Sequence, residues 1–98
     1  MRVVVIWRDE SEHGRGVREW LHELEHRTGR SVESYSPDEP DGESICRSYD
    51  VRIYPTILAL GNDGRVLQEW RGEMLPRIDD VSFYLINSYI KMNSEDGL

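Results

Sequence analysis

The chain has 98 residues, of which 38% are hydrophobic and 32% are charged, so it suits one globular domain with a modest core. Its formal net charge of −7 argues against nucleic acid or an anionic membrane as a partner, because both reward clustered lysine and arginine. A single cysteine excludes an internal disulfide, and no apolar run approaches the ~18 residues of a membrane span. These features predict a cytoplasmic protein.

The first part of the chain predicts a strand followed by a helix. Residues 3–7 are uniformly apolar, as in a strand that is covered on both faces. Apolar residues then recur at helical spacing over residues 13–28, namely Val17, Trp20, Leu21 and Leu24. Asp9 or Ser11 is expected to cap this helix at its start, and Gly29 is expected to end it.

The middle of the chain predicts a second strand, a short helix and a hairpin. A strand is expected over residues 31–35, which contain Val32 and Tyr35, and a short amphipathic helix is expected over residues 43–49. Residues 56–60 are apolar and residues 65–70 alternate, while the Gly-Asn-Asp-Gly turn between them predicts an antiparallel pair.

A final helix is expected to begin at Pro76, so the predicted order is β-α-β-α-β-β-α over a domain of residues 1–92, with a flexible tail over residues 93–98. This order predicts an α/β fold with a four-stranded mixed sheet and helices on both faces. The final helix also carries a second apolar stripe of Phe83, Ile86 and Ile90. Either Trp20 or its neighbours cover this stripe, or it is a self-association face for a homodimer.

The stretch Tyr49-Asp50-Val51-Arg52-Ile53-Tyr54-Pro55-Thr56 places a proline where an apolar strand begins, a suitable position for a cis peptide bond. It resembles the segment around the cis-proline of the thioredoxin superfamily. The resemblance covers roughly residues 2–92 and indicates a short, glutaredoxin-sized member with a thioredoxin-like fold. It places Trp7 where the family has the tryptophan at the end of the strand that precedes its active site.

The same resemblance implies that the redox centre is missing. The segment Ser11-Glu12-His13-Gly14 stands where the family has its Cys-Gly-Pro-Cys motif, and Val5 stands where it has a buried acid. Thiol–disulfide exchange needs an activated thiolate and a second thiol to resolve the mixed disulfide. A dithiol oxidoreductase is therefore excluded, and neither a cofactor nor a catalytic residue is predicted.

Without the redox centre, the resemblance still implies a binding groove. An open strand edge beside a cis-proline pairs with extended peptides, and a helix start opposite it favours hydrogen-bond acceptors. The expected function is a non-redox module that binds a protein or peptide. The candidate groove residues are Trp7, Ser11, Glu12, His13, Gly14, Tyr54, Pro55 and Thr56.

Other patterns in the sequence suggest alternatives. Cys46 is a candidate reactive thiol for a single-thiol, redox-responsive protein, and the stripe on the final helix suggests a self-associating structural domain. His22 and His26 match the His-Glu-x-x-His zinc signature, but helical geometry turns them away from the apolar face of Val17 and Leu24. A third ligand and a cleft are not evident, so no metal site is predicted.

Overall fold

The structure, a computed structural model, describes residues 1–72 and 74–85. The strands are β1 (Arg2–Ile6), β2 (Glu33–Tyr35), β3 (Thr56–Leu60) and β4 (Val66–Arg71). The helices are α1 (Gly14–Thr28) and α2 (Pro40–Tyr49), and residues 78–85 are helical as well. Among the described residues, no helix combines the length and the hydrophobicity that crossing a membrane requires.

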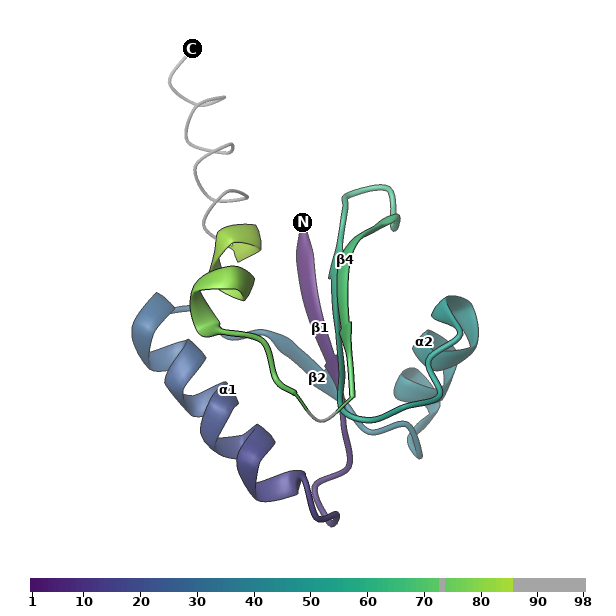
Figure 1. The fold of residues 1–98 in the computed structure, drawn as a ribbon. Helices are drawn as coiled ribbons and strands as arrows, with labels where there is room; N and C mark the ends of the chain where they lie inside the picture. The colour runs from purple at the N-terminus through teal and green to yellow at the C-terminus, as the bar shows by residue number, and fades with distance from the viewer. Residues whose placement is uncertain (73, 86–98) are drawn as a thin grey trace.

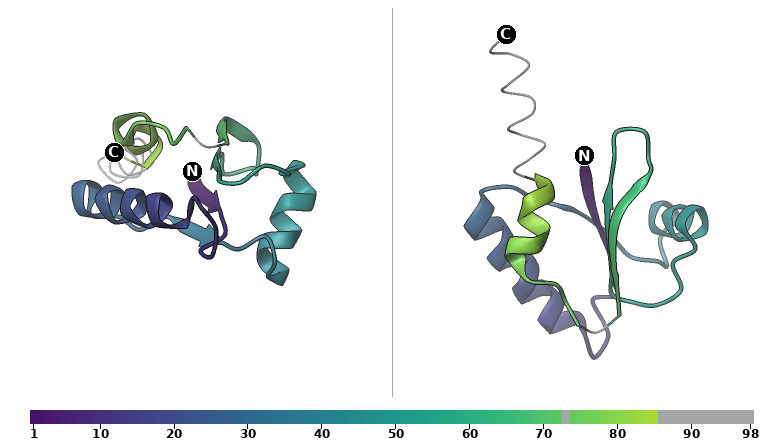
Figure 2. Two further views of the ribbon diagram at one scale, coloured as in Figure 1. Left: turned by 60° about the horizontal axis from the view of Figure 1, so that its bottom comes forward. Right: turned by 45° about the horizontal axis from the view of Figure 1, so that its top comes forward.

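The four strands form one mixed sheet in the order β2-β1-β3-β4. β1 pairs in parallel with β2, and β3 runs antiparallel to both β1 and β4. Figures 1 and 2 show α1 and the helix at 78–85 on one side of the sheet and α2 on the other. The predicted α/β fold, with its element order and its mixed four-stranded sheet, is confirmed.

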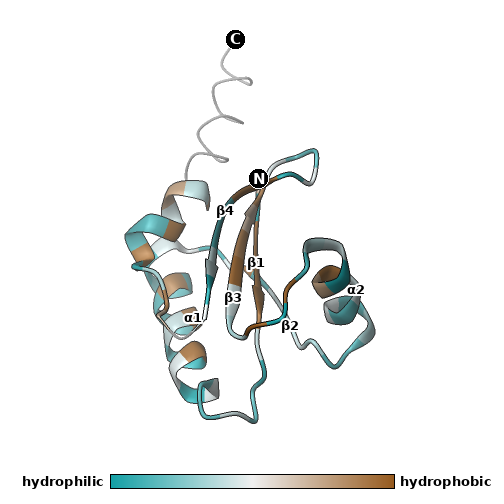
Figure 3. Ribbon diagram, turned by 45° about the vertical axis from the view of Figure 1, so that its right-hand side comes forward, coloured by the Kyte–Doolittle hydropathy of each residue, from teal (hydrophilic) through white to brown (hydrophobic). Residues whose placement is uncertain are grey.

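The core has two halves because side chains alternate between the faces of a strand. From β1, Val3 and Val5 enter the half that is covered by α1, whereas Val4 and Ile6 enter the half that is covered by α2. All four side chains are at most 3% exposed. In Figure 3 the ribbons of the central strands β1 and β3 have largely hydrophobic colours. Burial on both faces explains why the segment from Val3 to Ile6 contains no polar residue.

The start of α1 differs from the expectation. The N-cap is His13, and no side chain caps the helix. The Ser11 hydroxyl instead donates to the carbonyl oxygen of Arg8 at 2.7 Å, and the Asp9 carboxylate pairs with Arg18. Ser11 is therefore bonded within the loop and Asp9 is paired with a side chain of α1, so neither residue caps the helix. At the other end, Gly29 adopts φ 68° and closes α1 as predicted, donating its N–H to the Glu25 carbonyl at 2.8 Å.

Two other helix starts are also shifted. α2 begins at Pro40 rather than at residue 43, because proline is well tolerated in the first turn of a helix. The final helix begins at residue 78, two positions after the expected start at Pro76. The carbonyl of Pro76 accepts a hydrogen bond of 2.9 Å from the Trp20 indole, which ties this segment to α1.

Candidate functional site

The Tyr54–Pro55 segment leads directly into the buried strand β3. The peptide bond between the two residues is cis. The Pro55 carbonyl accepts a hydrogen bond of 2.8 Å from the Gly72 N–H, and the Ile53 carbonyl accepts one of 2.6 Å from the Thr56 hydroxyl. These bonds hold the Pro55 ring at the end of the sheet where β1 finishes.

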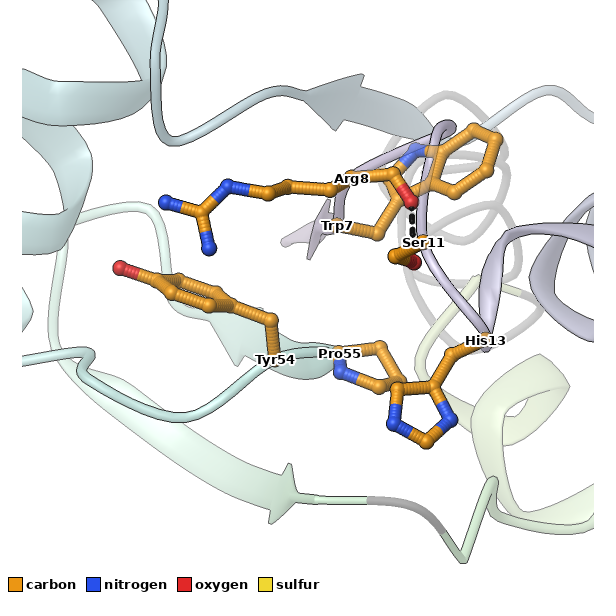
Figure 4. A pocket seen from close by; sticks show the side chains of 6 residues that line it. All are labelled: Trp7, Arg8, Ser11, His13, Tyr54 and Pro55. Carbon is orange, nitrogen blue, oxygen red and sulfur yellow. Dashed lines mark hydrogen bonds between the residues drawn. The ribbon is translucent and has the colours of Figure 1, made fainter.

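The loop between β1 and α1 lies opposite this segment. It leaves the sheet at Trp7, whose N–H donates to the Tyr35 carbonyl at 3.1 Å. Two hydrogen bonds then fold the loop back. The Ser11 hydroxyl donates to the Arg8 carbonyl at 2.7 Å, and the Gly14 N–H donates to the Ser11 carbonyl at 3.1 Å. Three residues of this loop, Arg8, Ser11 and His13, face the Tyr54–Pro55 segment (Figure 4).

The loop and the Tyr54–Pro55 segment enclose a cavity of about 120 Å³ (Figure 4). We call it the Pro55 cavity, and it is lined by Trp7, Arg8, Ser11, His13, Tyr54 and Pro55. Aromatic rings and the proline ring supply much of its wall, so the cavity presents an apolar interior beside a polar loop. Largely apolar walls with a few polar groups are typical of ligand-binding pockets.

Five predicted groove residues line the Pro55 cavity, and three do not. Glu12 is exposed and does not line the cavity, although its carboxylate lies 3.7 Å from the ring of His13, which does. Gly14 is buried at the start of α1. Thr56 is fully buried, and its hydroxyl is bonded to the Ile53 carbonyl, so its side chain has no access to a ligand.

Arg8 is the cavity residue that sequence reasoning missed. Its guanidinium donates to both carboxylate oxygens of Asp38, at 2.8 and 3.0 Å, and lies 4.9 Å from the centre of the Tyr54 ring. This bidentate pair of hydrogen bonds holds the pKa of Asp38 below its ordinary value. Asp38 lies 30 residues from Arg8, and no sequence signal pairs the two.

Tyr54 links the cavity to α2. Its hydroxyl donates to the Cys46 sulfur at 4.0 Å, a weak contact, on the side away from Pro55. Burial raises the pKa of the Tyr54 phenol above its ordinary 10.0, and the neighbouring Cys46 raises it further.

We expect a pH titration of near-ultraviolet absorbance to show Tyr54 ionising above pH 10. Because the folded state favours the neutral phenol, its stabilising contribution is complete below the unfolded pKa and is lost as the pH rises through the folded pKa. The difference between wild type and Tyr54→Phe isolates this residue. Ionisation of Tyr54 at or below the pH of an exposed tyrosine would contradict the expectation.

Cys46, the candidate reactive thiol, is half-buried on α2 and does not line the Pro55 cavity. It contributes to a shallow depression on the surface of α2 and the segment after it. The other lining residues of this depression are Glu43, Arg47, Asp50, Val51 and Arg52.

The remaining candidates lie apart from the cavity. His22 and His26 line a shallow surface depression with Glu25 on the exposed face of α1, and within the described residues no group of three or more His, Cys, Asp or Glu is arranged to hold a metal ion. Phe83 is 57% exposed, with its ring against Tyr84, so Trp20 does not cover it. The other two residues of the predicted stripe, Ile86 and Ile90, lie outside the described residues.

No protein-family model matches the sequence, and no curated protein matches it. The structure is nevertheless similar to thioredoxin 1 from the thermophilic eubacterium Thermosipho africanus TCF52B, with a TM-score of 0.62 and 13% identity over 96% of this chain and 99% of that chain. The fold is thioredoxin-like.

Two further solved structures support this fold. A malarial protein has a TM-score of 0.60 and 18% identity over 87% of this chain and 92% of that one. A chain in the complex of ferredoxin:thioredoxin reductase with thioredoxin f2 has a TM-score of 0.58 and 16% identity, covering 90% and 78% of the two chains. At these identities the likeness concerns the thioredoxin-like fold alone.

Gly14 shows how closely the loop between β1 and α1 is packed. A Cβ atom at this position would lie 1.9 Å from the Asp9 carbonyl oxygen and 2.8 Å from its carbon. Position 14 therefore has no room for a side chain unless the loop or the helix moves. In the resemblance to the thioredoxin family, this is the position of the second cysteine.

Proposed function

We propose that this thioredoxin-like chain is a binding module that holds an extended segment of a partner protein at the Pro55 cavity, without redox chemistry. The observation that carries the proposal is the apolar cavity itself, formed where the loop after β1 meets the Tyr54–Pro55 segment. A cavity of about 120 Å³ suits one aliphatic side chain rather than a large cofactor.

The backbone beside the cavity supports an extended ligand. The carbonyls of Ile53 and Pro55 are bonded within the chain, whereas the N–H and C=O of Tyr54 form no hydrogen bond with another described residue. A peptide that lies alongside Tyr54 would satisfy these groups as a neighbouring strand does. Main-chain bonds would then supply affinity, and the cavity would select the side chain.

Two further features support a function without thiol chemistry. The only cysteine of the chain is on α2, outside the lining of the cavity. At position 14 the Asp9 carbonyl leaves no room for a Cβ atom, so the observed backbone accepts only glycine and not a cysteine. A module of this kind would retain the shape of a thioredoxin-like groove and use it for recognition.

We expect random linear peptides selected on the full chain to bind at the Pro55 cavity. In amide NMR spectra of the labelled protein, these binders should shift the resonances of residues 7–13 and of Ile53, Tyr54 and Thr56. Ser11→Leu should weaken them about tenfold or more, equivalent to about 1.4 kcal/mol, because the new side chain projects into the cavity. Fluorescence anisotropy of labelled peptides measures this loss.

Ser44→Leu is the matched control, because it makes the same substitution at an exposed position on α2. It should leave peptide affinity unchanged. Binders that shift resonances elsewhere on the chain, or that respond equally to the two substitutions, would overturn the proposed function.

A further inference from the structure

Four acidic residues lie next to residues that line the Pro55 cavity, either in the sequence or, for Asp38, through a bond to Arg8. Glu10 and Glu12 flank the lining residue Ser11 in the loop after β1, and both are exposed. Asp38 and Glu39 are exposed on the segment that leads into α2, and Asp38 is bonded to the lining residue Arg8. Two separate segments of the chain thus contribute acidic residues next to the cavity lining.

The cations near the cavity do not balance these charges. The Arg8 guanidinium is engaged by both oxygens of Asp38 and is stacked on Tyr54, so its charge is already compensated. Arg18 is likewise paired with the Asp9 carboxylate. Glu10 and Glu39 form no ion pair with another described residue. The local excess is negative, in the same direction as the net charge of −7.

We propose that the partner segment is cationic and carries an aliphatic side chain between lysine or arginine residues. This inference rests on the proposed function and names the chemistry of its ligand. The aliphatic side chain would occupy the Pro55 cavity, whose walls are largely rings. The flanking cations would lie toward Glu10 and Glu12 on one side and toward Glu39 on the other.

Charge complementarity favours this partner over the alternatives. An acidic segment would bring like charges to Glu10, Glu12 and Glu39, and Arg8 is not free to compensate them because Asp38 holds it. These carboxylates are exposed, so water and salt screen their attraction for a cationic ligand. The attraction should therefore weaken with added salt.

The test uses four short peptides with blocked ends. Three contain a central leucine between pairs of lysines, glutamines or glutamates, and the fourth has glycine in place of leucine between lysines. At about 20 mM salt, we expect the lysine peptide to bind about tenfold or more tighter than the glutamate peptide, and at about 300 mM salt this ratio should shrink severalfold. The glycine peptide should bind weakly at both salt concentrations.

A pair of charge variants localises the effect. The double variant Glu10→Gln and Glu39→Gln should reduce the preference for lysine over glutamine peptides about threefold or more, because it removes two of these carboxylates. The double variant Glu23→Gln and Glu25→Gln changes the net charge equally on the exposed face of α1 and should leave the preference intact.

The outcomes separate the two proposals. Equal binding of the lysine, glutamine and glutamate peptides, with amide shifts at the cavity, would overturn the cationic partner and leave the proposed function standing. An equal loss in both double variants would overturn the local role of Glu10 and Glu39. Equal binding of the glycine and leucine peptides would overturn the aliphatic anchor. If no leucine peptide shifts the amides around the cavity, the proposed function itself fails.

Discussion

Replacing Gly14 with alanine should lower the free energy of unfolding by about 2–4 kcal/mol, because the added methyl group has no space. Its Cβ would lie 1.9 Å from the Asp9 carbonyl oxygen and 3.3 Å from that of Arg8, and both neighbours are backbone atoms that cannot rotate away. Either the start of α1 or the loop after β1 must move. A chain of this size has a total stability of about 5–15 kcal/mol, so the loss is a large fraction of it.

Gly16→Ala is the matched control in the same helix. A Cβ at Gly16 would meet nothing within 4 Å, and the backbone there is helical, so alanine should raise stability by about 0.5–1 kcal/mol. Urea denaturation, with the slope compared between variants, measures both changes. Similar stabilities for the two variants would show that the loop after β1 yields easily, contrary to its packing here.

The change Val5→Asp should lower the free energy of unfolding at neutral pH by about 3–5 kcal/mol. Val5 is fully buried, in the half of the core that contains Val17, Leu24 and Ile57. These neighbours are hydrocarbon and give a carboxylate no hydrogen-bond partner. The substitution also tests whether this core can hold the acid that the thioredoxin family has at the corresponding position.

The loss should depend on pH in a defined direction. Burial raises the pKa of the new carboxyl group above its unfolded value of about 3.9, because burial disfavours the charged form. The variant should therefore be least destabilised below that value and should lose stability as the pH rises through the folded pKa. Val5→Thr, which has nearly the same shape, should cost only about 1–3 kcal/mol without this pH dependence. Equal losses at acid and neutral pH for Val5→Asp would contradict a dry apolar site.

Much of the fold could be predicted from local patterns. The uniform apolar run from Val3 to Ile6 indicated a strand covered on both faces, and the structure buries its side chains in the two halves of the core, one on each face of the sheet. Gly29 and the turn from Gly61 to Gly64 ended their elements where backbone freedom was needed, with φ of 68° at Gly29 and 84° at Gly64. These signals are reliable because they arise from the residues of the element itself.

The site could be predicted only in part. Five cavity residues were identified from the resemblance of residues 49–56 to the thioredoxin superfamily and from their positions counted along the chain. They are Trp7, Ser11, His13, Tyr54 and Pro55, and the structure places all of them around one cavity. Burial of the Thr56 side chain could not be foreseen, because it depends on how β3 pairs with both of its neighbours.

The amino-acid sequence by itself determined the order of the elements, the two apolar faces of the sheet and the absence of a second cysteine, because each follows from residue type and spacing along the chain. Tertiary structure alone decided that Arg8 is held by Asp38 over the Tyr54 ring and that the Asp9 carbonyl leaves no room for a side chain at Gly14. The physical reason is that the electrostatics and the free space at a site depend on which distant segments the sheet brings together, and sequence spacing does not encode that proximity.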